Sequence, residues 1–238
     1  NERLPHGPGL PIWLLALALA FFGIAGVEGF WRLHGYRPSV VDDMDLWCVQ
    51  RSRIERAGPD TVVLLGMSRI QEGFVRETFE EECPSYTSLQ LAIGAWHPIA
   101  AFRDIAENTD FAGVVICSIT PASLLPETWD QQEPYVRYYH KEWQFNNKLN
   151  RMLRTFFQSH LALLYPDLTL QAAAPDIARG RWPLQWIWTN PDRTQVVDYT
   201  KPDLNAFTES RAQTHQRNVE RYISLDGYTQ WPAGLEQI

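Results

Sequence analysis

The stretch that decides the fold is Asp60–Phe74, DTVVLLGMSRIQEGF. Within it, Thr61–Leu65 are β-branched residues or leucines, the pattern of a strand buried on both faces of a parallel sheet. Gly66 ends this run, and Ser68 follows where the strand gives way to a polar segment. Open α/β sheets carry out their chemistry in the crevice outside the strand tips. Ser68 is therefore either a candidate nucleophile or simply the N-cap of the next helix.

The residues Gly66-Met67-Ser68-Arg69 after a hydrophobic strand resemble the first block of the SGNH (GDSL-like) hydrolases. The likeness is greatest to their membrane-anchored branch, which includes the alginate O-acetylation proteins and the D-alanylation protein of Gram-positive walls. That branch tolerates residues other than aspartate before the serine. The resemblance covers about Leu46–Pro126 and implies a doubly wound, mainly parallel sheet with Ser68 as the nucleophile.

The same resemblance implies where the oxyanion donors lie. In SGNH-like proteins a glycine in the loop after the second strand offers its backbone N–H, and Gly94 matches that position best. A preorganised donor of this kind lowers the barrier by about 3 kcal/mol, although Gly94 can equally serve only to permit a tight turn. The family's third block supplies a side-chain donor from asparagine. Here the available substitutes are Ser118, Thr120 and Ser123, of which Thr120 is the main candidate.

A serine nucleophile also needs a general base, usually a histidine oriented by a carboxylate. SGNH enzymes carry this pair late in the chain as Asp-x-x-His. The most similar sequence here is Asp226–Thr229, which has threonine in place of the histidine. His97 follows the second predicted strand and is the candidate base closest to Ser68. The other histidines considered, His140, His160 and His215, are expected to be structural or solvated.

Three apolar runs predict adjacent parallel strands joined by right-handed helical crossovers. We expect strands at Thr61–Leu65, Tyr86–Ala92 and Gly113–Ile119, the last of them central, and helices at Leu46–Ala57, Val75–Glu82 and Pro98–Glu107. A doubly wound sheet normally has about five strands. Further strand-like runs, Trp186–Thr189 and Gln195–Tyr199, are short and flanked by prolines, so we expect the sheet to be incomplete.

The N-terminal region predicts a transmembrane anchor. Leu10–Val27 contains no charged residue, and this run is long enough for a spanning helix. Trp13 and Trp31 bracket it, about 27 Å apart along a helix, as expected of tryptophans at the two interfaces. A cleaved signal peptide has a shorter apolar core, so we favour a retained anchor. The predicted organisation is a tail (1–9), the anchor (10–31), a connector (32–45) and an α/β domain with a tryptophan-rich, helical C-terminal extension (46–238).

The anchor has a face that another membrane helix can approach. Gly23, Gly26 and Gly29 recur every third residue and leave that face thin. Glu28 either reaches the interface or pairs with a partner helix. We therefore expect an integral membrane partner in addition to the lipid bilayer.

The orientation signals conflict. Arg32 and Arg37 follow the span whereas Arg3 precedes it, which would place the domain inside. Members of the resembled family work on the outer face. We follow the resemblance and expect a single-pass protein of the bacterial inner membrane with a periplasmic domain.

Two segments of the C-terminal half leave alternatives open. Glu142–Leu164 has a helical apolar pattern, with Lys148, Arg151 and Arg154 on its other side. It is either a cover helix for the core or a helix lying on anionic headgroups. Gly180–Pro191 contains three tryptophans, which mark a membrane or partner surface unless they pack under a loop. A final charged helix is expected at Ser210–Tyr222.

Composition limits the function classes. The net charge of −7 argues against a nucleic-acid partner. The three cysteines form no metal signature; the sequence leaves open whether Cys48 and Cys83 pair in an oxidising compartment, and Cys117 is expected in the core. No cofactor motif is present. Two functions remain: an acyl-transferring or ester-hydrolysing enzyme acting on an envelope glycan, or a non-catalytic subunit that docks within a larger membrane assembly, for example a respiratory or photosynthetic one.

Overall fold

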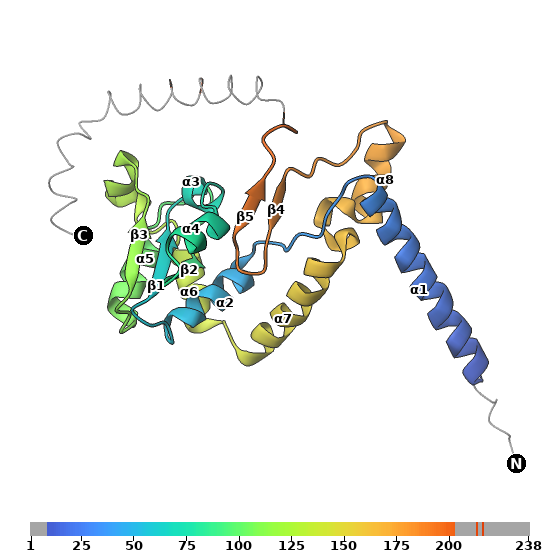
Figure 1. The fold of residues 1–238 in the computed structure, drawn as a ribbon, viewed down its shortest axis with the longest axis horizontal. Helices are drawn as coiled ribbons and strands as arrows, with labels where there is room; N and C mark the ends of the chain where they lie inside the picture. Colours follow the sequence, from blue (N-terminus) through green and yellow to red (C-terminus); the bar gives the residue numbers. More distant parts are fainter. Residues whose placement is uncertain (1–8, 203–212, 214–215, 217–238) are drawn as a thin grey trace, which may run out of the picture. The chain divides into compact units, whose positions relative to one another are not determined.

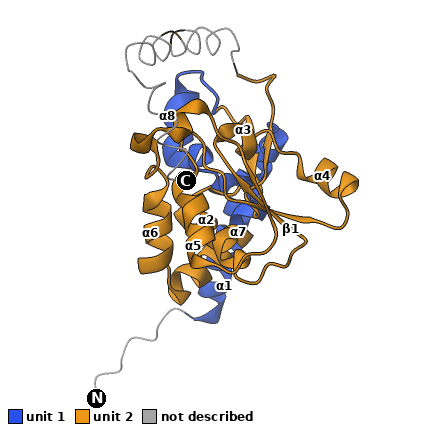
Figure 2. Ribbon diagram, turned by 90° about the vertical axis from the view of Figure 1, so that its left-hand side faces the viewer, with its two compact units in different colours: residues 1–39, 157–183 blue, residues 40–156, 184–238 orange. Residues whose placement is uncertain are grey.

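The computed structural model describes residues 9–202 together with Gln213 and Gln216. The chain divides into two compact units (Figure 2): unit 1 comprises residues 1–39 and 157–183, and unit 2 comprises residues 40–156 and 184–238. Apart from Gln213 and Gln216, the helix predicted at Ser210–Tyr222 lies outside the described residues. So do His215 and Asp226–Thr229.

Unit 2 is a mixed α/β unit built on a small parallel sheet (Figure 1). Its strands β1 (Thr61–Leu65), β2 (Thr87–Gln90) and β3 (Val114–Cys117) pair in the order β2-β1-β3, and Val63 lies opposite both Leu89 and Val115. The prediction of three adjacent parallel strands is confirmed. The prediction that the third strand is central is wrong. β1 has that place and all five of its residues are buried, whereas β3 is at an edge of the described sheet with Val114 and Ile116 exposed.

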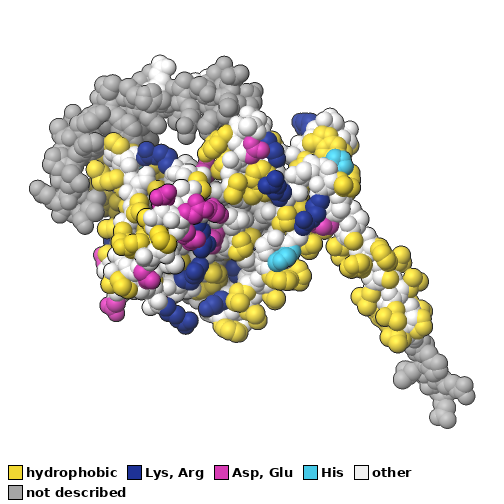
Figure 3. All heavy atoms as spheres, in the orientation of Figure 1, with side chains coloured by type: hydrophobic (Ala, Val, Ile, Leu, Met, Phe, Trp, Pro, Cys, Tyr) yellow, Lys and Arg dark blue, Asp and Glu magenta, His cyan; other side chains and the backbone are white. Residues whose placement is uncertain are grey.

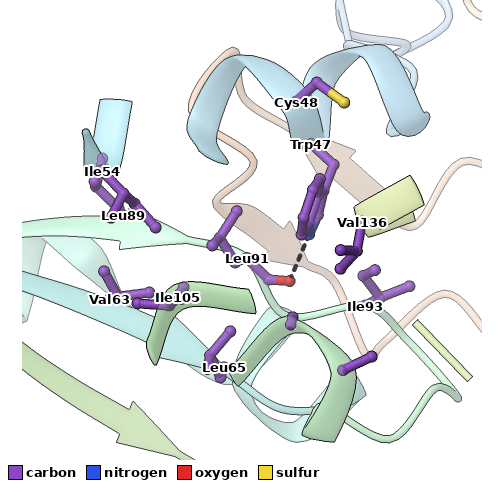
Figure 4. Packing of buried hydrophobic residues seen from close by; sticks show 12 residues of the cluster. Trp47, Cys48, Ile54, Val63, Leu65, Leu89, Leu91, Ile93, Ile105 and Val136 are labelled. Carbon is purple, nitrogen blue, oxygen red and sulfur yellow. Dashed lines mark hydrogen bonds between the residues drawn. The ribbon is translucent and has the colours of Figure 1, made fainter. Parts of the chain in front are cut away.

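Helices pack against one face of this sheet. α2 (Met44–Ile54) begins at Asp43, whose carboxylate accepts the Leu46 N–H at 3.0 Å. The core between the helices and the sheet combines residues of α2, of the three strands, of α5 (Ile99–Asn108) and of α6 (Glu133–Lys141). Trp47 is buried at its centre, and its indole N–H donates to the Leu91 carbonyl at 3.0 Å (Figure 4). This bond fixes α2 over the end of β2.

The remaining elements of unit 2 are short. β1 leads into α3 (Ser68–Gln71) and α4 (Arg76–Glu82), and β3 leads through the 3-10 turns η1 (Pro121–Leu124) and η2 (Pro126–Thr128) to α6. β4 (Ile187–Thr189) and β5 (Gln195–Val197) form a separate two-stranded antiparallel sheet. The late strand-like runs are thus strands, but they pair with each other and do not extend the parallel sheet.

Unit 1 holds α1 (Leu10–Leu33), a helix of 24 residues that is long and apolar enough to cross a membrane. Hydrophobic side chains cover α1 in Figure 3. Three short segments pack at its carboxyl end: η3 (Ala162–Leu164), η4 (Pro166–Leu168) and α8 (Leu170–Ala178).

Trp31 does not have the exposure expected of an interfacial tryptophan. Trp31 is 1% exposed and forms the core of unit 1 with Ala162, Leu168 and Ala173, whereas Trp13 at the other end of α1 is 59% exposed. Near the carboxyl end of α1, the exposed tryptophan is Trp182. Its ring stacks on the His34 ring at a centroid distance of 4.9 Å. Trp31 is therefore enclosed by protein, and its ring has no surface to offer to lipid headgroups.

One further expectation needs correction, and one open question is answered. The helical pattern of Glu142–Leu164 forms α7 (Phe145–His160), whose apolar residues are exposed, so it is not a cover helix for the core. The sequence left the pairing of Cys48 and Cys83 open, and both are free thiols in the structure. Cys48 is buried in the core cluster instead, and Cys117 packs at the edge of that cluster.

Candidate functional site

The loops that follow the three parallel strands lie side by side at the carboxyl end of the sheet. The Ser118 N–H donates to the Leu65 carbonyl at 2.9 Å, and the Ile93 N–H donates to the Gly66 carbonyl at 3.1 Å. Gly66 has a φ of 149°, and a Cβ there would lie 3.1 Å from the Ser118 Cβ. Only glycine allows this close crossing of the first and third loops.

Ser68 is the first residue of α3, and Met67 occupies the N-cap. The alternative that Ser68 only caps the helix is therefore wrong. Its side chain is half-buried, and its hydroxyl makes no hydrogen bond within the described part of the chain. Ser68 thus has the position of a strand-end nucleophile, but none of the described residues acts on it as a base.

The backbone N–H of Gly94 is already engaged. It donates to the Gln71 side-chain carbonyl at 2.6 Å, and the Gln71 amide in turn donates to Asp42 at 2.5 Å. Gln71 is buried, three residues after Ser68. The candidate oxyanion donor and the candidate nucleophile therefore lie on adjoining loops, but the donor is occupied by a protein acceptor.

A buried arginine holds this arrangement from the other side. Arg193, in the turn between β4 and β5, donates to both oxygens of Asp42 at 2.6 and 2.9 Å. It also donates to the carbonyls of Gln90 and Ala92 at 3.1 and 3.0 Å. Arg193 thus binds the carbonyl groups at the end of β2 and the Asp42 carboxylate together. Asp42 and Gln71 therefore have little freedom to turn away from Gly94.

His97 is paired with a hydroxyl and not with a carboxylate. Its Nδ1 lies 2.7 Å from Oγ of Ser123, which is fully buried, and its backbone N–H donates to the Gln131 side chain at 2.9 Å. Burial lowers the pKa of the His97 imidazole, which favours the neutral form. No hydrogen bond joins His97 to Ser68 among the residues described. His97 therefore lacks the carboxylate that orients a catalytic histidine.

Thr120, the candidate side-chain donor, is used locally. It is the N-cap of η1; its N–H donates to the Ser123 Oγ at 3.0 Å, and the two hydroxyl oxygens lie 3.2 Å apart. Ser123 thus joins Thr120 to His97. The structure brings the loops carrying Ser68, Gly94, His97 and Thr120 to one end of the sheet, but the Gly94 N–H, the His97 Nδ1 and the Thr120 hydroxyl all have internal partners.

No family model, curated protein or solved structure matches the chain. The chemistry of the site is therefore inferred from the geometry of its own residues.

A second polar cluster, which the sequence did not reveal, ties α2, α5 and α6 together. Asp104 is buried; Arg51 Nε donates to it at 2.6 Å and His140 Nε2 lies 2.6 Å from its other oxygen. Burial alone would raise the pKa of Asp104, but the bonds from Arg51 and His140 outweigh it and hold the pKa below its usual value. The Arg51 guanidinium also stacks over the Tyr139 ring at 4.8 Å.

This cluster borders an open groove of about 690 Å³ between α5 and α6. Charged side chains of both signs line it, including Arg103, Glu107, Arg137 and Lys141, but no serine, threonine or cysteine does. The groove therefore offers a histidine and a carboxylate without a hydroxyl or thiol nucleophile of Ser, Thr or Cys. In the described residues, no group of three or more His, Cys, Asp or Glu is placed to hold a metal ion.

The residues that sequence reasoning missed are Gln71, Asp42 and Arg193. Gln71 looked like an ordinary helix residue and Asp42 like part of a solvated acidic connector. Arg193 lies 151 residues from Asp42. No local pattern indicates such a contact.

Proposed function

We propose that this protein is a membrane-anchored, non-catalytic docking subunit whose α/β unit resembles an SGNH domain. The observation that supports this function is the Gln71 carbonyl bound to the Gly94 N–H at 2.6 Å. An oxyanion hole needs its donors aimed at empty space that the substrate oxygen will occupy. A buried side-chain oxygen fills that space here.

Opening this site would be costly. The Gln71 carbonyl would have to leave Gly94, and its amide would have to leave Asp42, which Arg193 holds in place. Leaving a buried donor or acceptor unpaired costs about 1–3 kcal/mol. The Ser68 hydroxyl would still have no base, and an unactivated hydroxyl is a weak nucleophile.

In this proposal α1 spans the bacterial inner membrane and the α/β unit is periplasmic. The face bearing Gly23, Gly26 and Gly29 receives a helix of an integral membrane partner, since a Cβ added at any of these glycines would meet no atom within 4 Å. The partner does not pair with Glu28. That carboxylate accepts the backbone N–H groups of Ala162 and Leu163, both at 3.0 Å.

The second candidate function is acyl transfer or ester hydrolysis on an envelope glycan, with Ser68 taking an acyl group delivered by a membrane-bound O-acyltransferase partner. One observation favours it: the Ser68 hydroxyl is without a hydrogen bond in the described structure, at the end of the sheet where such chemistry is expected. His97 would then have to act as the base, and Gly94 and Thr120 as oxyanion donors, after a rearrangement.

A fluorophosphonate probe on the purified full chain distinguishes the two functions. We expect no labelling of the wild type or of Ser68→Ala, together with co-purification of integral membrane proteins. Gly26→Leu, which fills the glycine face, should remove those proteins without affecting the fold of unit 2. Stoichiometric labelling that disappears in Ser68→Ala would overturn the docking proposal and support the enzyme.

A further inference from the structure

Helix α7 has its apolar side outward. Six large apolar side chains are between 48% and 75% exposed: Phe145, Leu149, Met152, Leu153, Phe156 and Phe157. The only buried residues of the helix are Arg151 and Gln158. Gln158 follows Leu149 by nine residues, which at about 100° per residue places it half a turn away. The helix is thus amphipathic, with the opposite sense to a helix that covers a core.

Specific polar contacts fix this rotation. Arg151 is fully buried; its Nη1 donates to Asp43 at 2.8 Å and its Nη2 donates to the Val41 carbonyl at 2.9 Å. Arg154 adds an ion pair to the same carboxylate at 3.4 Å. Turning the apolar side inward would break these contacts, and the partly buried Asp43 carboxylate would lose its ion pair with Arg151. The outward apolar side is therefore a built feature of the fold.

The carboxyl end of α7 meets α1 at the end of its uncharged run. Arg32 donates to the His160 carbonyl at 2.7 Å, and Glu28 binds the two N–H groups that begin η3 directly after α7. Residues 28–32 are where α1 changes from apolar to polar. If α1 spans the bilayer, as proposed above, the last turn of α7 lies at the level of the headgroups.

The charge of α7 suits the same environment. Lys148, Arg151 and Arg154 are its charged residues besides His160, and the helix contains no aspartate or glutamate. Soluble monomers seldom expose a continuous apolar patch of this kind. Arg151 and Arg154 pair with Asp43, so Lys148 is the basic residue of α7 that can face anionic headgroups, beside an apolar face of the kind found in interfacial helices.

We propose that α7 lies in the headgroup layer of the membrane that α1 crosses, with its apolar face among the acyl chains and Lys148 at the anionic phosphates. A hollow of about 380 Å³ beside Met152 and Phe156, closed by Leu46 and Val49 of α2, extends the apolar surface. The contact with lipid is independent of whether Ser68 is active. It rests only on the proposal that α1 is a transmembrane helix.

Photocrosslinking in native membranes tests this contact. A benzophenone amino acid is placed at Leu149 or Leu153 on the apolar face. The matched control is position 154, where Arg154 follows Leu149 by five residues, about 140° around the helix. A probe at Leu17, exposed in α1, reports separately whether the anchor contacts lipid. Adducts are identified by mass spectrometry after irradiation of the full chain.

We expect phospholipid adducts from positions 17, 149 and 153, at least several-fold above position 154. Lipid adducts at 17 with none at 149 and 153 would overturn the inference about α7 and leave the anchor intact. Adducts of 149 and 153 to a protein would show that a partner covers this face, and would overturn the lipid proposal as well. Absence of lipid adducts at all four positions would refute the anchor together with it.

Discussion

Replacing Arg193 by methionine should destabilise unit 2 far more than removing an exposed arginine. The buried guanidinium donates to both oxygens of Asp42 and to the carbonyls of Gln90 and Ala92, at distances of 2.6 to 3.1 Å. Methionine fills much of the same space but donates no hydrogen bond. It leaves Asp42 charged and without its counter-ion.

The expected loss follows from the burial of the two partners. Removing one partner of a buried ion pair costs roughly 3–5 kcal/mol. The Asp42 side chain is 17% exposed, so water can solvate part of the carboxylate. We therefore expect about 3 kcal/mol, at the lower end of that range. With a shift of roughly 2–4 °C per kcal/mol in a unit of this size, Tm should fall by about 6–12 °C.

Thermal unfolding of the purified full chain in detergent, followed by tryptophan fluorescence, measures this fall. Arg103→Met is the matched control. Arg103 pairs with Asp130 at 3.0 Å, but the two side chains are 42% and 77% exposed, and such pairs contribute about 0–1 kcal/mol. Adding Asp42→Asn to Arg193→Met should restore part of the stability, because a neutral amide is cheaper to leave unpaired. Equal midpoints for Arg193→Met and Arg103→Met would refute the clamp.

Three further predictions concern pH, thiols and orientation. Because burial lowers the pKa of His97, its protonation favours the unfolded chain, so stability should fall as pH drops below about 6.5 towards the folded pKa. The loss should be absent in His97→Gln, and an equal loss in the variant would contradict it. Stability from Asp104, whose pKa is lowered, should disappear only below pH 3.8. Burial raises the pKa of Cys48 strongly and that of Cys117 to about 11. Maleimide at neutral pH should therefore label Cys83 first, without prior reduction. If labelling required a reductant, Cys83 would be in a disulfide. In intact spheroplasts, external protease should cleave the α/β unit, and a protected unit would refute the periplasmic orientation.

The parallel sheet could be predicted from the sequence because its signal is local. Thr61–Leu65 has no polar residue after the first threonine, and burial on both faces of a central strand requires that pattern. Gly66 and Gly94 mark the ends of the first two strands by a signal that is also local in the sequence. The positions of the candidate residues at one end of the sheet follow from parallel topology alone.

The state of the site could not be predicted, because it depends on partners far apart in the chain. Gln71 reaches Asp42 and Gly94, which lie 29 and 23 residues away. Periodicity cannot show whether a polar helix residue points to solvent or into a strand-end crevice. The burial of Trp31 could not be predicted for a similar reason. Ala162 and Leu168, which enclose its ring, lie more than a hundred residues later in the chain.

The connector after α1 links the two unexpected features of the molecule. Asp42 holds Gln71 against the Gly94 amide, which closes the candidate oxyanion site. Its neighbour Asp43 binds Arg151, which turns the apolar side of α7 outward. Two adjacent carboxylates of one short segment thus favour an occupied Gly94 amide and an outward apolar side of α7 together. Both contacts agree with our proposal that the protein serves attachment and not turnover.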